Sequence, residues 1–473
     1  MHQEKPPPIV HMDQTPSEQE LRDTLCAFKQ HHILTCLDII SPAQRAALLE
    51  DLKDIDFTQL ANRYQAYCRS NNEAAEKKVF DTAEIIALPF SKTFSAIGED
   101  YLRAGKVGLF LVAGGQGTRL GFKGPKGCFP ISPVRHKSLF QLFAESISAL
   151  ERRYGKPLSW YIMTSRENDA ETRRFFQEHN FFGRDQGYVQ FLVQGEIPSL
   201  DQQGQLLISR DLRVFKNPDG HGGSLRALKE SGALKDMQEK GIEEIFYFQV
   251  DNPLAKIADP LFIGAHVEHG AEMSTKVVQK TDPAEKVGII GKINGKTGCI
   301  EYSELTPAEM AEKREDGTLR FDSANIAIHM MKRTFVEQLT QDERFSLPYH
   351  VAIKDIECLA AENGLLIPDT RKGLKFEMFV FDALGFSTRS VTMQVKREEE
   401  FSPVKNYDGA DSPQTARQAM VNLFTRWVRK SGKAAHVPED LIVEVSPLFA
   451  LDETEFAKKF VPASALSSSL YIG

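Results

Sequence analysis

Residues 107–121 read VGLFLVAGGQGTRLG, and their pattern indicates the class of fold. Its first seven residues form a continuous apolar run without polar alternation, which is typical of a strand buried on both faces of a parallel sheet. The next eight residues hold glycines at positions 114, 115, 117 and 121. Because ligands of open parallel sheets bind at the carboxyl ends of the strands, the stretch predicts a buried strand that leads into a binding loop.

Apolar runs and helical patterns alternate along the chain beyond this strand. Further strands are predicted at 158–163, 188–193 and 244–250, and helices at 139–152, 167–179 and 224–240. Strands that alternate with helices indicate βαβ units and a mostly parallel sheet covered on both faces. We therefore predict an α/β fold with a doubly wound, mostly parallel, Rossmann-like sheet.

The remaining segments follow other patterns. Ser17 and Ser41 each begin a capping box, which indicates helices near the N-terminus. Residues 272–302 are rich in strand formers and contain an Asn294-Gly295 turn, which indicates an antiparallel extension beside the sheet. We predict a helical N-terminal unit at 1–104, a central domain at 105–389 and a small α/β C-terminal unit at 390–473.

Composition and charge exclude several classes of protein. The chain has 473 residues, with 58 Lys and Arg against 65 Asp and Glu and a formal net charge of −7. Nucleic-acid binding favours a basic surface, so we expect no nucleic-acid partner. There is no run of about 18 apolar residues and no apolar core of a secretory signal, so we expect no membrane partner. The six cysteines are widely spaced and form no C-x-x-C pair, which favours reduced thiols in a cytoplasmic protein.

The glycine-rich loop is suited to binding phosphate. Residues without a Cβ atom let backbone N–H groups approach phosphate oxygens, and Arg119 and Lys126 add positive charge. Two common phosphate motifs fail on spacing. The glycines at 115, 117 and 121 give G-x-G-x-x-x-G instead of the dinucleotide fingerprint G-x-G-x-x-G. Lys126 is followed by glycine instead of the Ser or Thr of a P-loop, so neither a hydride-transfer enzyme nor a P-loop ATPase is supported.

The loop, with Pro125-Lys126-Gly127 after it, resembles the signature loop of sugar-nucleotide pyrophosphorylases, specifically the eukaryotic-type UDP-N-acetylglucosamine pyrophosphorylases. The resemblance covers most of the chain and continues, in order, at 194–195, 217–223, 250–252, 283–288, 300–304, 325–327, 375–382 and 400–406. It implies a sheet of the nucleotide-diphospho-sugar transferase type. It also implies a reaction that joins UTP and a sugar 1-phosphate to give a UDP-sugar and pyrophosphate, so we expect these four molecules as partners.

The resemblance implies which residues handle the phosphates. The reaction is an in-line attack on the α-phosphorus, which needs positioning and charge neutralisation more than covalent chemistry. Gly114 and Gly115 would place backbone amides near the nucleotide. Arg119 would hold the leaving pyrophosphate, and Lys126 would neutralise charge at the α-phosphate. Lys405 matches a family lysine that reaches the phosphates from the C-terminal side, so we expect these three cations to be catalytic.

Two carboxylates are candidate metal ligands. Asp251 follows the predicted strand 244–250, at the sheet edge where the glycine loop also begins. A carboxylate among phosphates is best explained by Mg²⁺ coordination, and the alternative is a helix N-cap before Asn252-Pro253. Asp382 follows a short apolar run and is a second metal candidate, with a purely structural role as its alternative.

Other matched positions imply recognition of the uracil and the sugar. Gln194 would read the uracil, because an amide both donates and accepts hydrogen bonds, and Gly220 would let the backbone approach the base or the sugar. The sugar positions of the family match Gly288, Glu301, Tyr302 and Asn325. The alternatives are that Tyr302 packs in the core and that Asn325 lies in a turn.

One departure concerns the choice of sugar. The N-acetylglucosamine enzymes usually read Asp-Gly-Asn-Gly-Gly where this chain has His221, and here it resembles the UDP-glucose and UDP-sugar pyrophosphorylases. We include His221 among the substrate-binding residues. The leading hypothesis is a UDP-N-acetylglucosamine pyrophosphorylase. The alternatives are a UDP-glucose or broad-specificity UDP-sugar pyrophosphorylase and a non-catalytic UDP-sugar sensor.

Overall fold

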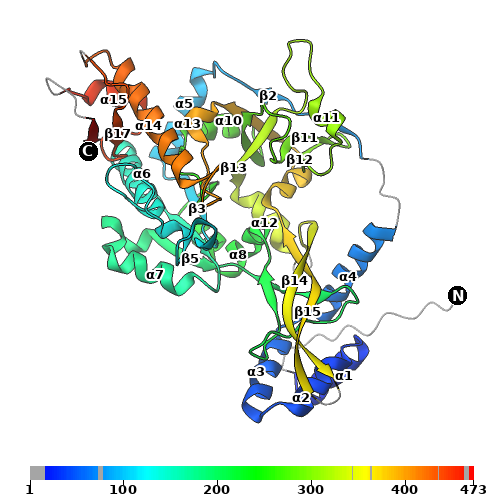
Figure 1. Ribbon diagram of the computed structural model, residues 1–473. Helices are drawn as coiled ribbons and strands as arrows, with labels where there is room; N and C mark the ends of the chain where they lie inside the picture. Colours follow the sequence, from blue (N-terminus) through cyan, green and yellow to red (C-terminus); the bar gives the residue numbers. More distant parts are fainter. Residues whose placement is uncertain (1–15, 73–77, 343–344, 363–364, 435, 463–467) are drawn as a thin grey trace. The chain divides into compact units, whose positions relative to one another are not determined.

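The computed structural model describes residues 16–72, 78–342, 345–362, 365–434, 436–462 and 468–473 (Figure 1). The chain folds into two compact units, which we call the smaller unit and the larger unit. The smaller unit contains Met1–Lys77, Gly195–Gly222 and Pro348–Phe379, and the larger unit contains Lys78–Gln194, Gly223–Leu347 and Val380–Gly473. Each unit is thus assembled from separate parts of the chain, and the three consecutive domains expected from the sequence stay a prediction.

The larger unit is built on a mostly parallel sheet. Along its main path the strands are β2 (Ile85–Ile86), β16 (Ser390–Val395), β10 (Met273–Gln279), β13 (Ser323–Lys332), β9 (Glu244–Gln249), β3 (Val107–Val112), β4 (Trp160–Thr164) and β5 (Val189–Val193). β13 is antiparallel to both of its neighbours on this path, and the other neighbouring pairs are parallel. The predicted α/β fold with a mostly parallel sheet is confirmed.

β3 lies where the continuous apolar run predicted it. Its residues from Val107 to Leu111 are buried, and Leu109 pairs with Trp160 of β4 and with Phe246 of β9. A strand covered on both faces has no solvent-facing position to fill with polar residues. Because β3 is parallel to both neighbours and β4 is parallel to β5, the carboxyl ends of β9, β3, β4 and β5 lie at one edge of the sheet. This edge carries the candidate site.

The larger unit also contains helices, which lie around the sheet (Figure 1). They are α5 (Lys92–Arg103), α6 (Leu139–Tyr154), α7 (Asp169–Glu178), α8 (Ser224–Glu230), α9 (Ala233–Glu239), α10 (Pro260–Glu268), α11 (Pro307–Ala311), α12 (Arg333–Gln341), α13 (Arg397–Glu400), α14 (Pro413–Lys430) and α15 (Glu453–Lys459). The single helix predicted at 224–240 is wrong. Gly232, at φ +75°, turns the chain between α8 and α9. Within the described ranges no helix combines the length and the apolar character needed to cross a membrane.

An antiparallel extension adjoins the main sheet. β11 (Ile289–Ile293) and β12 (Lys296–Ile300) form a hairpin, and β1 (Phe80–Thr82) pairs with β11. The predicted turn is confirmed, with Asn294 and Gly295 both at positive φ. The predicted extent of the extension is too long at its start, because Met273–Gln279 belongs to the main sheet as β10.

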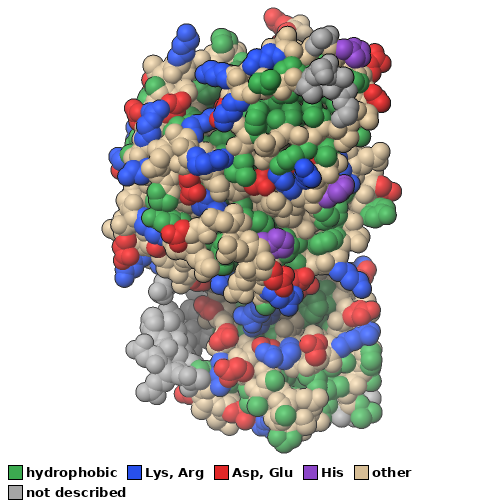
Figure 2. All heavy atoms as spheres, turned by 90° about the vertical axis from the view of Figure 1, so that its left-hand side faces the viewer, with side chains coloured by type: hydrophobic (Ala, Val, Ile, Leu, Met, Phe, Trp, Pro, Cys, Tyr) green, Lys and Arg blue, Asp and Glu red, His purple; other side chains and the backbone are tan. Residues whose placement is uncertain are grey.

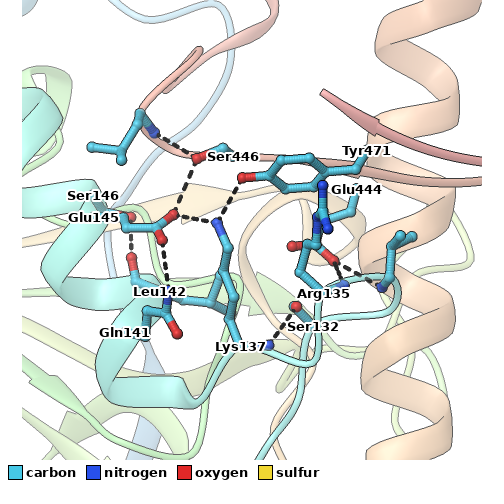
Figure 3. A network of polar contacts seen from close by, with 12 residues as sticks. Ser132, Arg135, Lys137, Gln141, Leu142, Glu145, Ser146, Glu444, Ser446 and Tyr471 are labelled. Atoms are coloured by element: carbon cyan, nitrogen blue, oxygen red, sulfur yellow. Dashed lines mark hydrogen bonds and ion pairs between the residues drawn. The ribbon is translucent and has the colours of Figure 1, made fainter. Parts of the chain in front are cut away.

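The last strands of the chain form a separate parallel pair, β17 (Ile442–Val445) and β18 (Ser469–Ile472). A polar network joins β18 to α6 (Figure 3). Lys137 Nζ lies 2.6 Å from Glu145 Oε2 and donates a hydrogen bond to Tyr471 Oη at 3.0 Å. Lys137 therefore links β18 to α6.

The smaller unit combines helices and a separate sheet. Its helices are α1 (Glu18–Ala27), α2 (His31–Ile39), α3 (Pro42–Lys53) and α4 (Phe57–Asn72), and its strands are β6 (Glu196–Pro198), β7 (Leu200–Asp201), β8 (Lys216–Pro218), β14 (Tyr349–Glu362) and β15 (Leu365–Met378). Both predicted capping boxes are present, at Ser17 and Ser41. Leu25, Leu52 and Phe376 belong to one buried cluster, so the N-terminal helices pack against the β15 strand.

Figure 2 shows Lys and Arg side chains mixed with Asp and Glu side chains over one face of the molecule. This mixture agrees with an overall charge close to balance, at −7 for 473 residues. Because the surface charge is mixed, we expect binding of a polyphosphate to depend on a few cations placed at a defined site.

Candidate active site

The glycine-rich loop begins where β3 ends and lies beside Gln194. A Cβ atom built on Gly114 would lie 2.9 Å from Gln194 Oε1, so the backbone of Gly114 and the side chain of Gln194 are in contact. Gln194 follows β5, and its N–H donates to the Thr164 carbonyl at 2.8 Å. The structure thus brings together the predicted phosphate loop and the predicted uracil reader.

Asn168 binds the backbone of the glycine-rich loop through hydrogen bonds, and it was not identified from the sequence. Its Nδ2 donates to the carbonyls of Ala113, at 3.0 Å, and Gly115, at 3.3 Å. Its Oδ1 accepts the Ser165 N–H at 2.8 Å, and the side chain is fully buried. A signal for this role was present, because Asn168 lies just after the carboxyl end of β4, at the same edge of the sheet as the loop.

Lys126 is the central cation of the site. Its N–H donates to the Gly115 carbonyl at 3.0 Å, and its Nζ donates to the Val404 carbonyl at 3.3 Å. Burial lowers the pKa of Lys126, Arg119 and Lys405 lower it further, and Asp251 raises it. Three cations and one carboxylate therefore influence one another electrostatically around this ammonium group.

Asp251 lies just beyond β9, and its carbonyl accepts the Val404 N–H at 2.8 Å. The alternative of a helix N-cap is wrong, because the next helix is α10, which Asp259 caps. In the part of the chain that the structure describes, no three or more His, Cys, Asp or Glu side chains gather as a metal site. Mg²⁺ in phosphate-transfer sites binds one or two carboxylates together with substrate phosphates. A single carboxylate beside Lys126 fits that requirement.

Arg119 and Lys405 are the more accessible cations. Arg119 lies on a 3₁₀ helix, Thr118–Leu120, and is exposed. Lys405 is also exposed, with Nζ 3.6 Å from Asp411 Oδ2. Tyr407 contacts the glycine loop, since a Cβ atom built on Gly121 would lie 3.0 Å from its ring. The segment that carries Lys405 therefore reaches the loop, and Tyr407 is a second neighbour that the sequence did not reveal.

Most of the predicted sugar residues form a second cluster. A Cβ atom built on Gly288 would lie 2.6 Å from Cys299 Sγ and 3.7 Å from Glu301 Oε1. The Asn325 N–H donates to the Gly288 carbonyl at 2.9 Å. Burial raises the pKa of the Cys299 thiol, the carboxylates of Glu301 and Asp382 raise it further, and a hydrogen bond with the Asn325 side chain lowers it. Asp382 therefore lies near this second cluster.

Two alternatives for this cluster are wrong. Tyr302 is 38% exposed and so does not pack in the core. Asn325 lies within β13 and not in a turn, and its Oδ1 accepts the Ala327 N–H at 2.9 Å.

Gly220 and His221 belong to the smaller unit. Gly220 has φ +83°, and a Cβ atom there would lie 2.4 Å from the Met378 carbonyl oxygen, so only glycine fits. The His221 ring stacks on Phe379, with centroids 5.1 Å apart and planes at 19°. His350 also stacks on Phe379, at 4.3 Å and 29°. Burial lowers the pKa of His221 to about 4, and His350 contributes in the same direction, so His221 is neutral at pH 7.

A mostly parallel sheet with a glycine loop, a partly buried lysine and a carboxylate at one edge is typical of a nucleotidyltransferase. The sequence profile of the UTP–glucose-1-phosphate uridylyltransferase family matches residues 56–463. The chain therefore belongs to this family.

Individual relatives cover nearly the whole chain. The UDP-N-acetylglucosamine pyrophosphorylase of Saccharomyces cerevisiae is 36% identical over 449 residues, which cover 90% of this chain and 90% of the yeast protein. The UDP-N-acetylhexosamine pyrophosphorylase-like protein 1 of Homo sapiens is 35% identical over 441 residues, or 88% of this chain and 86% of that protein. These matches confirm the resemblance to the eukaryotic-type UDP-N-acetylglucosamine pyrophosphorylases.

Solved structures agree with the sequence comparisons. The uridine diphosphate N-acetylglucosamine pyrophosphorylase from Trypanosoma brucei superposes with a TM-score of 0.79 and 26% identity, covering 98% of this chain and 99% of the other. A UDP-glucose pyrophosphorylase from Leishmania major superposes with a TM-score of 0.58 at 16% identity, covering 77% of each chain, and shares the fold.

Proposed function

We propose that this protein joins UTP and N-acetylglucosamine 1-phosphate to give UDP-N-acetylglucosamine and pyrophosphate. The observation that carries the proposal is the arrangement of Lys126, with Arg119, Lys405 and Asp251 acting on it at the edge of a parallel sheet. The relatives from yeast and Trypanosoma brucei are both UDP-N-acetylglucosamine pyrophosphorylases, which supports the same sugar for this protein.

The chemistry follows from these charges. An oxygen of the sugar phosphate attacks the α-phosphorus of UTP in line, the bond from that phosphorus to the bridging oxygen breaks, and pyrophosphate leaves. Lys126 is partly buried and fixed by Gly115 and Val404, so its charge acts through a less polarisable medium than water. It would stabilise charge at the α-phosphate. Arg119, which is exposed, would hold the leaving pyrophosphate.

We propose Asp251 as the ligand of Mg²⁺, with Asp382 as a second candidate. When bound, Mg²⁺ supplies neutralisation of phosphate charge. The support for Asp251 is its electrostatic effect on Lys126, whereas Asp382 acts on Cys299 near the sugar cluster.

The sugar would be recognised by the second cluster. Glu301 would accept hydrogen bonds from sugar hydroxyls, and Asn325 would contact the hydroxyl or N-acetyl groups. Gly288 and Tyr302 match the remaining sugar positions of the family. Gln194 would read the uracil. His221 favours a second candidate, transfer to glucose 1-phosphate, because this position resembles the UDP-glucose enzymes.

The test is release of pyrophosphate from UTP with the 1-phosphates of N-acetylglucosamine, N-acetylgalactosamine, glucose and galactose, compared in parallel. We expect N-acetylglucosamine 1-phosphate to give the highest kcat/KM. A preference for glucose 1-phosphate above about tenfold, roughly 1.4 kcal/mol of transition-state binding, overturns the sugar assignment. Binding of a UDP-sugar without pyrophosphate release under any condition favours the sensor.

We also propose a cytoplasmic location. The six cysteines are all free thiols, which supports a reducing compartment.

A further inference from the structure

A buried ion cluster lies at the start of the segment that carries Lys405. Lys276 of β10 is fully buried, with Nζ 2.7 Å from Asp259 Oδ2 and 2.5 Å from Glu400 Oε2. The two carboxylate side chains are only 3% and 8% exposed. Burial raises the pKa of Asp259, but Lys256 and Lys276 outweigh burial and hold that pKa below its usual value. A charged lysine is costly in a protein interior unless it is compensated, and here Asp259 compensates it.

The cluster ties the central sheet to one particular point of the chain. Glu400 is the last residue of α13, and Lys405 follows five residues later. Asp259, the other carboxylate, caps α10 by accepting the Leu261 N–H at 3.3 Å. Lys276 therefore fixes the start of the Glu400–Lys405 segment to both β10 and α10.

Asn252 holds the same segment one step further along. Its Nδ2 donates to the Glu400 carbonyl at 2.7 Å, and its Oδ1 accepts the Ser402 N–H at 3.2 Å. The Asn252 side chain is buried. Because one amide side chain serves both a carbonyl and an N–H of the segment, its backbone is fixed in position and in direction.

The attachment continues into the candidate active site. The Val404 N–H donates to the carbonyl of Asp251, the neighbour of Asn252, at 2.8 Å. The Val404 carbonyl accepts from Lys126 Nζ at 3.3 Å. The segment is thus held at residues 400, 402 and 404, and its last attachment is the ammonium group at the centre of the site.

We propose that Lys276 and Asn252 are positioning residues, which hold the Glu400–Lys405 segment so that Lys126, Asp251 and Lys405 keep the relative positions that phosphate transfer needs. The proposal rests on the proposed uridylyl transfer. Neither residue is assigned a contact with substrate. Lys126 depends on them because the carbonyl that receives its Nζ hydrogen bond belongs to the segment they hold. Displacement of a catalytic group by about 1 Å is enough to slow a reaction by about a hundredfold.

The first test uses Asn252→Ala, which removes both side-chain bonds to the segment and introduces no charge. We expect kcat for pyrophosphate release to fall at least about tenfold, with KM for UTP changed less than about threefold. Hydrogen exchange of the Ser402 and Val404 amides should accelerate at least about tenfold, while amides of β3 keep their protection. The matched control is Asn422→Ala, an exposed asparagine on α14 that makes no hydrogen bond to the segment in the described structure, and this variant should change none of these quantities.

The second test compares two buried lysines. Lys276→Met breaks the cluster at Asp259 and Glu400, and Lys137→Met breaks the similarly buried pair with Glu145 (Figure 3). Both variants should melt at a lower temperature, but only Lys276→Met should lower kcat in the folded protein. The proposal is overturned if Asn252→Ala keeps the wild-type kcat, or if Lys137→Met lowers kcat as much as Lys276→Met.

The proposed function and the positioning role can fail separately. If the unmodified protein releases no pyrophosphate with any of the four sugar 1-phosphates, the proposed function fails. The exchange measurement still decides the positioning role in that case, because unchanged exchange at Ser402 and Val404 in Asn252→Ala overturns it.

Discussion

His221 stacks on Phe379 with ring centroids 5.1 Å apart and an angle of 19° between the planes. The stack places an imidazole, which can carry a positive charge, against an apolar ring. Burial lowers the pKa of His221 from its usual 6.5 to about 4. A residue singled out for substrate recognition therefore also has a role in packing.

This lowered pKa predicts how stability depends on pH. Between pH 4 and 6.5 the unfolded chain binds a proton at His221 that the folded chain does not, so the free energy of unfolding falls as pH is lowered through this window. His221→Asn should reduce the slope of the free energy of unfolding against pH, in this window, by up to about 1.4 kcal/mol per pH unit. Urea unfolding at several pH values checks this, and identical slopes for the variant and the parent contradict it. Other histidines, such as His32, are present in both proteins, so their contributions to the pH dependence cancel in the comparison.

The same substitution tests the role of His221 in sugar choice. His221→Asn introduces the residue that the resemblance associates with N-acetylglucosamine enzymes. We expect the ratio of kcat/KM for N-acetylglucosamine 1-phosphate to that for glucose 1-phosphate to rise about fivefold, or about 1 kcal/mol. An unchanged ratio, measured by pyrophosphate release, would show that the residue serves only packing.

Lys126 should matter to turnover far more than to stability. Lys126→Met removes charge from the centre of the site, and kcat should fall at least about a hundredfold. Burial already lowers the pKa of Lys126, so the folded state disfavours its charged form and the free energy of unfolding should stay equal or rise. Lys123→Met, at an exposed position of the same loop, is the control and should keep full activity. A variant at 126 that unfolds more easily yet turns over normally would contradict the assignment.

Chelation should stop the reaction and Mg²⁺ should restore it. Asp251→Asn removes one negative charge from the proposed ligand, so half-maximal pyrophosphate release should need at least about tenfold more Mg²⁺. Asp382→Asn serves as the comparison, and we expect a smaller shift because Asp382 acts on Cys299 near the sugar cluster. If Asp382→Asn gives the larger shift, Asp382 is the principal ligand.

Sequence patterns predicted the parts of the fold that depend on neighbouring residues. The apolar run at Val107–Val112 and the glycines after it identified β3 and its loop, because burial on both faces and a close backbone approach each restrict the residue types allowed. The position of Asp251 at the same edge of the sheet was predicted for the same reason, because this residue follows the buried strand β9.

The positioning residues and the stacked rings at Phe379 could not be predicted from patterns of neighbouring residues. Lys276 and Asn252 act through partners that lie 124 and 148 residues further along the chain. The stack of His221 and His350 on Phe379 joins distant segments of the smaller unit. No periodicity or spacing in one stretch of sequence reports such pairs, because they exist only once the topology has brought the strands and loops together.

The attachment of the Glu400–Lys405 segment at residues 400, 402 and 404 restricts its length. Insertion or deletion of one residue between Glu400 and Pro403 would move Pro403, which has no N–H, into a place where a donor is required. It would also replace Lys405 with its neighbour. Chains built on this plan must therefore keep the number of residues in the segment as well as the side chains at its two ends, Glu400 and Lys405.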